Sequence, residues 1–342
     1  MTELMTEMSK SGKRKVKIGT LLVQVRSLSV FIIFALLFFV FFILSPGHRF
    51  VSKDNLDVFL ALGAEFNIVA LAVGMLMISG EFDLSVGSVL VFCSFVFLKL
   101  FEVGLPVLVA AILTVVVGGI IGYIHGSITV KAKIPSFITT LGGMMFWRGV
   151  TLFWSGGLQK PLETESFPAF TAALTGKIWN FLPVQFVWFI GIMLILMFIV
   201  QYHKFGNWIY TTGDNPLAAR AMGINTDRVK IICFIVVSFI CSFVAVMQIA
   251  RIGVFTSRAG DGWELKAIAA SVVGGTALSG GIGTIFGVFW GALVISIIEN
   301  GLVVLRIPYA WTYTVFGVVI ISSVLIGMYI EKRQMMLGAE RT

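Results

Sequence analysis

The chain has 342 residues, of which 58% are hydrophobic and only 12% are charged, and its mean hydropathy is +0.99. A soluble domain carries about a quarter charged residues, so this composition excludes a water-soluble fold and indicates an integral membrane protein. The net charge of +8 would suggest a nucleic-acid partner in a soluble protein. Here the basic residues flank hydrophobic segments, so we interpret them as membrane anchors and expect membrane lipid as a partner and no nucleic acid.

The N-terminal segment is basic and is followed directly by a long apolar run. Residues 1–27 carry Lys10, Lys13 and Arg14 and are predicted to form a cytoplasmic tail. The run at 28–45 is uncharged, rich in Phe and long enough to cross a bilayer. No small-residue cleavage pattern follows it, so we interpret it as a retained first span and not as a signal peptide.

Apolar runs long enough to span a membrane recur along the rest of the chain. The predicted spans are 28–45, 58–79, 86–101, 103–128, 134–154, 184–202, 230–250, 265–280, 282–304 and 310–330. The runs at 86–101 and 265–280 are short for a span and are expected to be tilted, broken or re-entrant. The sequence therefore predicts an all-α integral membrane protein with about ten transmembrane helices and both termini on one side.

The distribution of Lys and Arg predicts the orientation. More than half of the 25 basic residues fall in the segments that a cytoplasmic N-terminus would place inside the cell, which favours cytoplasmic N- and C-termini. The expected organisation is a transmembrane permease domain at 28–330 between the tail 1–27 and a second cytoplasmic tail at 331–342. It has a long outer loop at 155–183 and a long cytoplasmic loop at 203–229, and loops of this length are often functional.

Two glycine-rich junctions share the spacing Gly-x3-Leu-Ser-x-Gly, at 80–87 and 274–281. An internal repeat of two half-domains would explain this echo, although chance similarity is a rival in a chain so rich in Gly and Ser. In the first junction Asp83 or Ser85 is a candidate helix cap. The acids Glu81 and Asp83 are either turn residues or lie near a transport path or a partner surface. The chain contains no P-loop sequence of its own.

The cytoplasmic loop encodes a short helix. Asp214 or Asn215 can cap its start, Pro216 suits its first turn, and Gly223 fits the left-handed position that ends a helix. The small residues Ala218, Ala219 and Ala221 would allow close approach of another surface. Spacing alone leaves two interpretations equally open: the helix docks a cytosolic partner, or it lies on its own membrane domain.

Polar residues inside the predicted spans should face protein or water, because charged groups are costly in lipid. The polar residues considered are Glu65, Asn67, Thr139, Thr140, Arg148, Glu299 and Asn300. Trp311 and Tyr313 are expected to be interfacial anchors. Cys93, Cys233 and Cys241 lie in apolar runs and are expected to be packing residues. His48, His125 and His203 are scattered and form no catalytic motif, so we expect no enzymatic activity in this chain.

Four segments, taken together, resemble the permeases of monosaccharide ATP-binding-cassette (ABC) importers, of the ribose, xylose, arabinose and galactose type. The matching segments are Met77–Ser88, Pro135–Gly149, Thr212–Asn225 and Ile268–Thr284. The resemblance implies a permease subunit in a bacterial or archaeal cell membrane. It implies a second permease subunit (identical or paralogous), a cytosolic ABC ATPase and an extracytoplasmic solute-binding protein as partners. ATP and Mg would be bound by the ATPase, and this chain would hold no cofactor or metal.

The resemblance also implies roles for residues. The ATPase-coupling residues would be Asp214, Asn215, Pro216, Ala218, Ala219, Arg220, Gly223 and Ile224. Independently of the resemblance, polar residues within the spans and junctions are the candidates for the translocation path or junction: Asn67, Glu81, Asp83, Ser85, Thr139, Thr140, Arg148 and Asn300. The chain departs from the usual family pattern at Ser79 and at Glu81-Phe82.

Alternative functions stay open at this point. Related permeases carry nucleosides, autoinducers or branched-chain amino acids. An ion-coupled secondary transporter could use Glu65, Glu81 or Asp83 as its ion site, and a membrane receptor or scaffold would transport nothing. Only the ABC permease needs a cytosolic ATPase bound to the loop 203–229.

Overall fold

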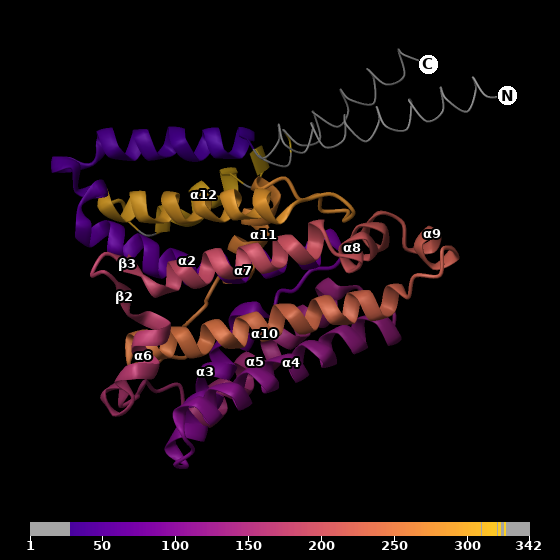
Figure 1. Ribbon diagram of the computed structural model, residues 1–342, viewed down its shortest axis with the longest axis horizontal. Helices are drawn as coiled ribbons and strands as arrows, with labels where there is room; N and C mark the ends of the chain where they lie inside the picture. The colour runs from indigo at the N-terminus through magenta and orange to yellow at the C-terminus, as the bar shows by residue number, and fades with distance from the viewer. Residues whose placement is uncertain (1–27, 309, 320, 323–324, 326–342) are drawn as a thin grey trace.

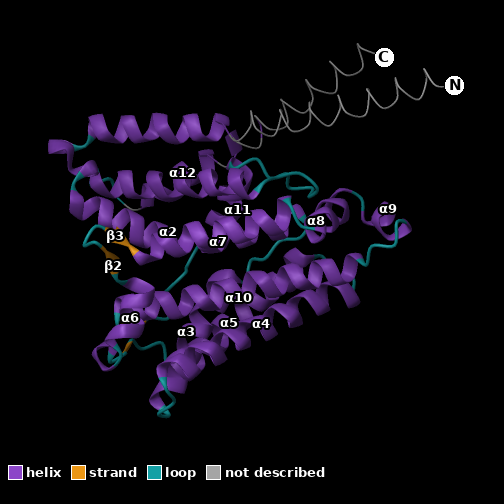
Figure 2. Cartoon of the chain, viewed as in Figure 1, coloured by secondary structure: helices purple, strands orange, loops and turns teal. Residues whose placement is uncertain are grey.

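The computed structural model describes residues 28–308, 310–319, 321–322 and 325, and this part of the chain is mostly helical (Figures 1 and 2). The predicted tails at 1–27 and 331–342 lie outside the described residues. Five described helices are long and apolar enough to cross a membrane. They are α2 (Lys53–Ile78), α4 (Val107–Lys131), α7 (Val184–Gln201), α10 (Thr226–Ile252) and α12 (Ile285–Val304). The chain is therefore a multi-pass membrane protein.

The other predicted spans also contain helices, most of them shorter. These are α3 (Val86–Glu102), α5 (Ser136–Ser155), α11 (Trp263–Val273) and the apolar helices Leu28–Leu44 and Ala310–Val319. The predicted boundaries are wrong for the span 265–280, since α11 stops at Val273 and the rest of that range is a glycine-rich loop. The predicted end of the last span, at residue 330, lies outside the described residues.

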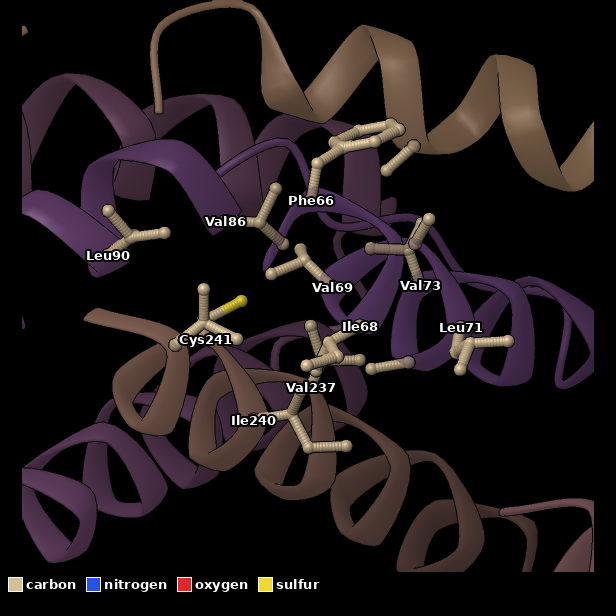
Figure 3. Packing of buried hydrophobic residues seen from close by; sticks show 14 of the residues in the cluster. Phe66, Ile68, Val69, Leu71, Val73, Val86, Leu90, Val237, Ile240 and Cys241 are labelled. Atoms are coloured by element: carbon tan, nitrogen blue, oxygen red, sulfur yellow. The ribbon is translucent and has the colours of Figure 1, made fainter. Parts of the chain in front are cut away.

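The long helices form two groups joined along α2 and α10. α2 packs against α7, α11 and α12, whereas α10 packs against α3 and α4, and α5 lies on α3. The two groups meet where α2 contacts α10. Figure 3 shows this contact: Ile68 and Val69 of α2, Leu90 of α3 and Val237 of α10 point toward one another. All four side chains are fully buried.

Close approach of α4 and α10 depends on glycines spaced four residues apart. A Cβ at Gly118 would lie 2.2 Å from Ser242 Oγ, and one at Gly122 would lie 2.4 Å from the carbonyl oxygen of Phe234. This spacing places small residues on one helix face, which lets membrane helices pack backbone against backbone. The opposite face of α4 carries exposed apolar side chains such as Ile120, as expected for contact with lipid.

The ends of the helical bundle differ. One end carries α6 (Pro168–Thr175), the 3-10 turns η1 (Pro46–Val51) and η2 (Thr164–Ser166), and two short antiparallel pairs of strands (Figure 1). These pairs are β1 (Lys160–Pro161) with β4 (Val254–Phe255), and β2 (Lys177–Ile178) with β3 (Leu182–Pro183). The other end carries α8 (Lys204–Asp214) and α9 (Pro216–Ala221), which form the loop 203–229 (Figure 1).

Candidate functional site

The two glycine-rich junctions predicted from the sequence lie against each other. The N–H of Gly281 donates to the carbonyl oxygen of Ile78 across 2.8 Å. A Cβ at Gly280 would lie only 2.6 Å from the Cα of Gly80. The segment between α2 and α3 therefore meets the segment between α11 and α12 by direct backbone contact.

The end of α8 is inserted into the same crossing. A Cβ at Gly213 would lie 2.0 Å from the carbonyl oxygen of Ile78 and 2.5 Å from the nitrogen of Gly281. Tyr210 adds a second tie, because its hydroxyl donates to the carbonyl oxygen of Gly283 at 2.8 Å. Burial raises the pKa of Tyr210 to about 12, so the phenol keeps this proton at physiological pH. The loop 203–229 is thus attached to both junctions at one point.

The short helix predicted in this loop is present as α9. Asn215 caps it, since its Oδ1 accepts from the amides of Leu217 at 3.1 Å and Ala218 at 3.0 Å. Of the two candidate caps the structure selects Asn215 and not Asp214. Pro216 occupies the first turn, and Gly223 follows the helix with φ +81°, as its predicted left-handed position requires. The helix α8, which precedes it, was not predicted.

One face of α9 is packed and the other is exposed. Ala219 is fully buried against the membrane domain, whereas Leu217 and Met222 are 78% and 66% exposed. Ala218 lies beside Leu217 and is exposed as well. The packed face agrees with a helix that lies on its own membrane domain, and docking of a cytosolic partner on the exposed apolar face stays a prediction. Ile224 is half-buried at the end of the segment.

A buried chain of hydrogen bonds begins at Asp83. Its Oδ1 accepts from the amide of Ser85 at 2.7 Å and from the hydroxyl of Ser85 at 2.5 Å. The same hydroxyl lies 3.1 Å from Nδ1 of His125, and Trp147 Nε1 donates to Nε2 of His125 at 3.1 Å. Because Nε2 accepts, a neutral His125 carries its proton on Nδ1, so every donor in the chain points toward Asp83.

The roles predicted for Asp83 and Ser85 need a correction. Ser85 is the N-terminal residue flanking α3, but its side chain makes no capping bond to the helix, and Asp83 bonds Ser85 in place of the α3 amides. Helix α5 holds this stretch instead. Ser136 Oγ accepts from the amide of Phe82, and Thr140 Oγ1 accepts from the amide of Leu84, each at 3.0 Å. Thr139 has no such contact, and its buried hydroxyl has no hydrogen-bond partner in the structure.

Glu81 is paired with a residue that the sequence did not single out. Its carboxylate forms a salt bridge with Lys230 near the start of α10. A second salt bridge, Arg220 to Asp227 at 2.6 Å, connects α9 to the same region of α10. Both pairs line a cavity of about 300 Å³. Glu81, which departs from the usual family pattern, therefore faces the loop 203–229 across this cavity.

The remaining predicted path residues are not gathered with this group. Asn67 accepts from Ser296 Oγ at 2.8 Å between α2 and α12. Asn300 exchanges two amide hydrogen bonds of 3.0 Å with Asn55 nearer the other end of α2. Both are satisfied inside helix contacts, so we interpret them as packing residues.

Arg148 lies apart from the junctions, on α5. Its Nη1 donates to the carbonyl oxygen of Ser257 at 2.7 Å, and its Nη2 lies 2.8 Å from Asp261 Oδ1. The loop that carries Ser257 and Asp261 joins β4 to α11. Sequence reasoning missed both partners, because a polar loop inside an apolar region gives no periodic signal.

Other charged groups in the core are paired across helices. Glu65 is buried and accepts from Arg251 at 2.6 and 3.0 Å, and Lys266 lies 2.8 Å from Glu299. In the described part of the chain, no group of His, Cys, Asp and Glu is arranged to hold a metal ion. The three cysteines are free and buried, as their apolar neighbours predicted.

Comparison with known proteins identifies the family. Residues 55–324 match the model of the branched-chain amino acid transport system permease component. The xylose/arabinose import permease protein XylH of Sulfolobus acidocaldarius is 34% identical over 87% of this chain and 82% of its own length. The probable ABC transporter permease protein YphD of Escherichia coli is 34% identical over 91% of this chain and 92% of its own.

A third relative, the autoinducer 2 import system permease protein LsrC of Photorhabdus luminescens, is 30% identical over 81% of this chain and 83% of its own length. No solved structure matches the chain. The family model covers more than half of the sequence and includes both glycine-rich junctions, α8 and α9. The chain therefore belongs to the family of ABC transport permeases described as the branched-chain amino acid transport system permease component.

Proposed function

We propose that the chain is the transmembrane permease subunit of an ATP-driven importer for a sugar or a similar small polar solute. Its family and the import permeases that it resembles support this function. Nucleosides, autoinducers and branched-chain amino acids are the alternative solutes. The names of the relatives favour a pentose or an autoinducer-like compound over an amino acid.

The proposed topology has ten membrane segments with both termini in the cytoplasm of a bacterial or archaeal cell. It is supported by the basic residues of the N-terminal segment and by the position of α9 at the opposite end of the bundle from α6 (Figure 1). In this orientation α8 and α9 face the cytoplasm, and α6 with the short strands faces outward. A solute-binding protein would deliver solute at the outer end, and a second permease subunit would complete the pore.

A cytosolic ABC ATPase is proposed to dock on the exposed face of α9. ATP and Mg would be bound there and not by this chain. The observation that carries the proposal is the backbone contact of Gly213 with Ile78 and Gly281, because Gly213 lies at the end of α8, directly before α9 in the chain. A displacement of α9 that moves the end of α8 would act on the end of α2 and on the loop before α12 through backbone contacts.

The experiment places a charge on the docking face. Ala218→Glu should abolish solute-stimulated ATP hydrolysis and uptake by the assembled importer while the permease itself stays folded. Ala132→Glu, at an exposed alanine after α4 on the same end, is the matched control and should leave both activities near the wild-type level. Normal coupling in Ala218→Glu would contradict docking on α9.

An ion-coupled carrier has less support. Such a carrier needs an acid that can exchange an ion or proton, but Glu65 is held by Arg251 and Glu81 by Lys230. Asp83 is the acceptor at the end of the His125 chain. No observation on the described residues favours an ion site over these structural pairings.

A further inference from the structure

The segment between β4 and α11 enters the membrane-spanning part of the fold as a series of turns, without helix or strand. Phe255 packs on Phe95 of α3, with ring centroids 5.3 Å apart. Five residues later, a Cβ at Gly87 in the first turn of α3 would lie 2.3 Å from the carbonyl oxygen of Gly260. Gly87 is about 22 Å from the Glu102 end of α3, at 1.5 Å per residue. The loop therefore descends well into the hydrocarbon depth, which is about 30 Å in total.

The helix α11 begins at this depth and continues in the same direction. It has 11 residues and ends at Val273, beside the glycine-rich crossing. The loop 256–262, which is built of turns, and α11 thus form one broken membrane segment, which includes the first part of the predicted span 265–280. Irregular backbone at membrane depth is tolerated only where it is buried in protein or lines a water-filled cavity.

Arg148 reaches this loop from α5. It lies about 10 Å from the Ser155 end of its helix and about 18 Å from the Ser136 end. Its guanidinium is held by the Ser257 carbonyl and by Asp261, and Glu264 lies close enough that its Oε2 would be 3.0 Å from a Cβ at Gly87. We call these four residues, Arg148, Ser257, Asp261 and Glu264, the Arg148 cluster.

The exposure of Asp261 indicates what the cluster faces. The side chain is 56% exposed and that of Arg148 is 21% exposed, although both lie at membrane depth. A charged side chain in this position faces water or protein and not lipid, because transfer of Asp or Arg to the bilayer centre is strongly unfavourable. Buried pairs elsewhere in the fold, such as Glu65 with Arg251, show no comparable exposure of the acid. The open side of the cluster therefore lies against water or another protein surface, and in the first case it would be the wall of a water-filled path.

The chemistry of the cluster suits a solute rich in hydroxyl groups. The guanidinium is fixed in one plane by two acceptors, and the exposed carboxylate of Asp261 retains acceptor capacity for a donor from solution. Trp263 is the first residue of α11, directly after this loop, and is half-buried, with its ring centroid 5.6 Å from that of Phe66. A polar group of fixed geometry next to an aromatic ring is the combination by which a concave site orients a small polar ligand.

We propose that the Arg148 cluster is a binding station for the hydroxyl groups of the transported sugar, midway along the path. The identity of the solute rests on the proposed function. The hydration of the cluster can be tested on the permease alone. The station would retain the solute weakly between its entry from the outer end and the opening of the crossing near α9. It assigns a role to Asp261 and Glu264, which the sequence did not indicate.

Cysteine labelling tests the wall directly, because all three native cysteines are buried. Asp261→Cys in liposomes should react with a charged, membrane-impermeant methanethiosulfonate at least about tenfold faster than Ile120→Cys, since only a hydrated thiol ionises readily. Ile120 is an exposed apolar residue in the middle of α4 and reports lipid. Equal rates for the two variants would overturn the proposal, whether lipid or a second subunit covers the cluster.

Protection and transport then test the station. In the assembled importer, D-xylose or L-arabinose delivered by the binding protein should slow the labelling of Asp261→Cys. The conservative variants Arg148→Lys and Asp261→Asn should raise the KM for uptake at least about tenfold, because hydroxyl-binding groups act on solute affinity. If neither sugar slows the labelling of Asp261→Cys and both conservative variants keep the wild-type KM for uptake, the proposed binding station is wrong. If the wild-type importer shows no solute-stimulated ATP hydrolysis, that result would count against the proposed function and not against the water-filled wall.

Discussion

The N–H of Gly281 bonds the carbonyl oxygen of Ile78, and this one hydrogen bond joins the end of α2 to the loop before α12. Between the two segments lies Gly213, the penultimate residue of α8. Three backbone segments from distant parts of the sequence therefore meet without side chains between them. Backbone segments in direct contact cannot move independently, so a shift of α9 that moves the end of α8 has to move the junctions as well.

Substitution of Gly213 tests this contact. Gly213→Ala should destabilise the permease by about 2 kcal/mol or more, because the added Cβ meets two backbone atoms that cannot rotate away. Thermal unfolding in detergent measures the loss. Gly142→Ala is the matched control, since a Cβ there has nothing within 4 Å and Ala is the better helix former. Equal melting temperatures for the two variants would contradict the tight crossing.

The cap of α9 gives a graded test of the docking helix. Asn215→Ala should cost about 1 kcal/mol of local helix stability, because two amide hydrogens lose their acceptor. Asn215→Asp should retain the cap, since Asp caps about as well. We expect solute-stimulated ATP hydrolysis to fall in the Ala variant and to stay near the wild-type level in the Asp variant. The opposite order would show that the amide, and not helix capping, matters at this position.

The salt bridge between Glu81 and Lys230 is suited to a double-mutant cycle. Glu81→Gln and Lys230→Gln should each lower uptake, because each leaves a partly buried charge without its partner. The combined variant Glu81→Lys with Lys230→Glu exchanges the two charges and should recover a large part of the uptake. The exposed pair Lys99 and Glu102 is the control, and its charge reversal should have little effect. Additive losses in the Glu81 and Lys230 variants would mean that the two residues act separately.

The hydrogen-bond chain from Asp83 through Ser85 and His125 to Trp147 predicts different tolerances to substitution at Asp83 and at His125. Asp83→Asn keeps an Oδ1 that accepts from Ser85, so transport should remain within a few-fold of wild type. His125→Phe should destabilise the fold by about 1 to 3 kcal/mol, because Trp147 and Ser85 would each lose a partner in a buried site. Uptake and thermal unfolding measured on both variants check this. A well-folded but inactive Asp83→Asn variant would assign the carboxylate charge a direct role in transport.

Much of the fold was accessible from the sequence, because length and hydropathy report membrane helices directly. The loop helix was also predictable, since Asn215, Pro216 and Gly223 are local signals for its start and end. The boundaries were less accurate for 265–280. The long run of small and apolar residues there hides the end of α11, which is determined by contacts of Gly274 with Gly287 and not by a local stop signal.

The partners of the polar residues were not predictable. Glu81 and Lys230, like Arg148 and Asp261, are far apart in sequence and are brought together only by helix packing. His125 was set aside because no neighbour in sequence suggested a role, yet it is the centre of the Asp83 chain. The meeting of the two glycine-rich junctions was equally hidden, because a shared spacing does not say that two segments touch.

The most direct test of the central claim is purification of the tagged chain from its native membrane, followed by identification of its partners and by measurement of ATP hydrolysis. We expect a P-loop ATPase to copurify and to lose solute stimulation when the permease carries Ala218→Glu, with Ala132→Glu unaffected. A stable preparation without an ATPase that moves solute down an ion gradient in liposomes would contradict the account.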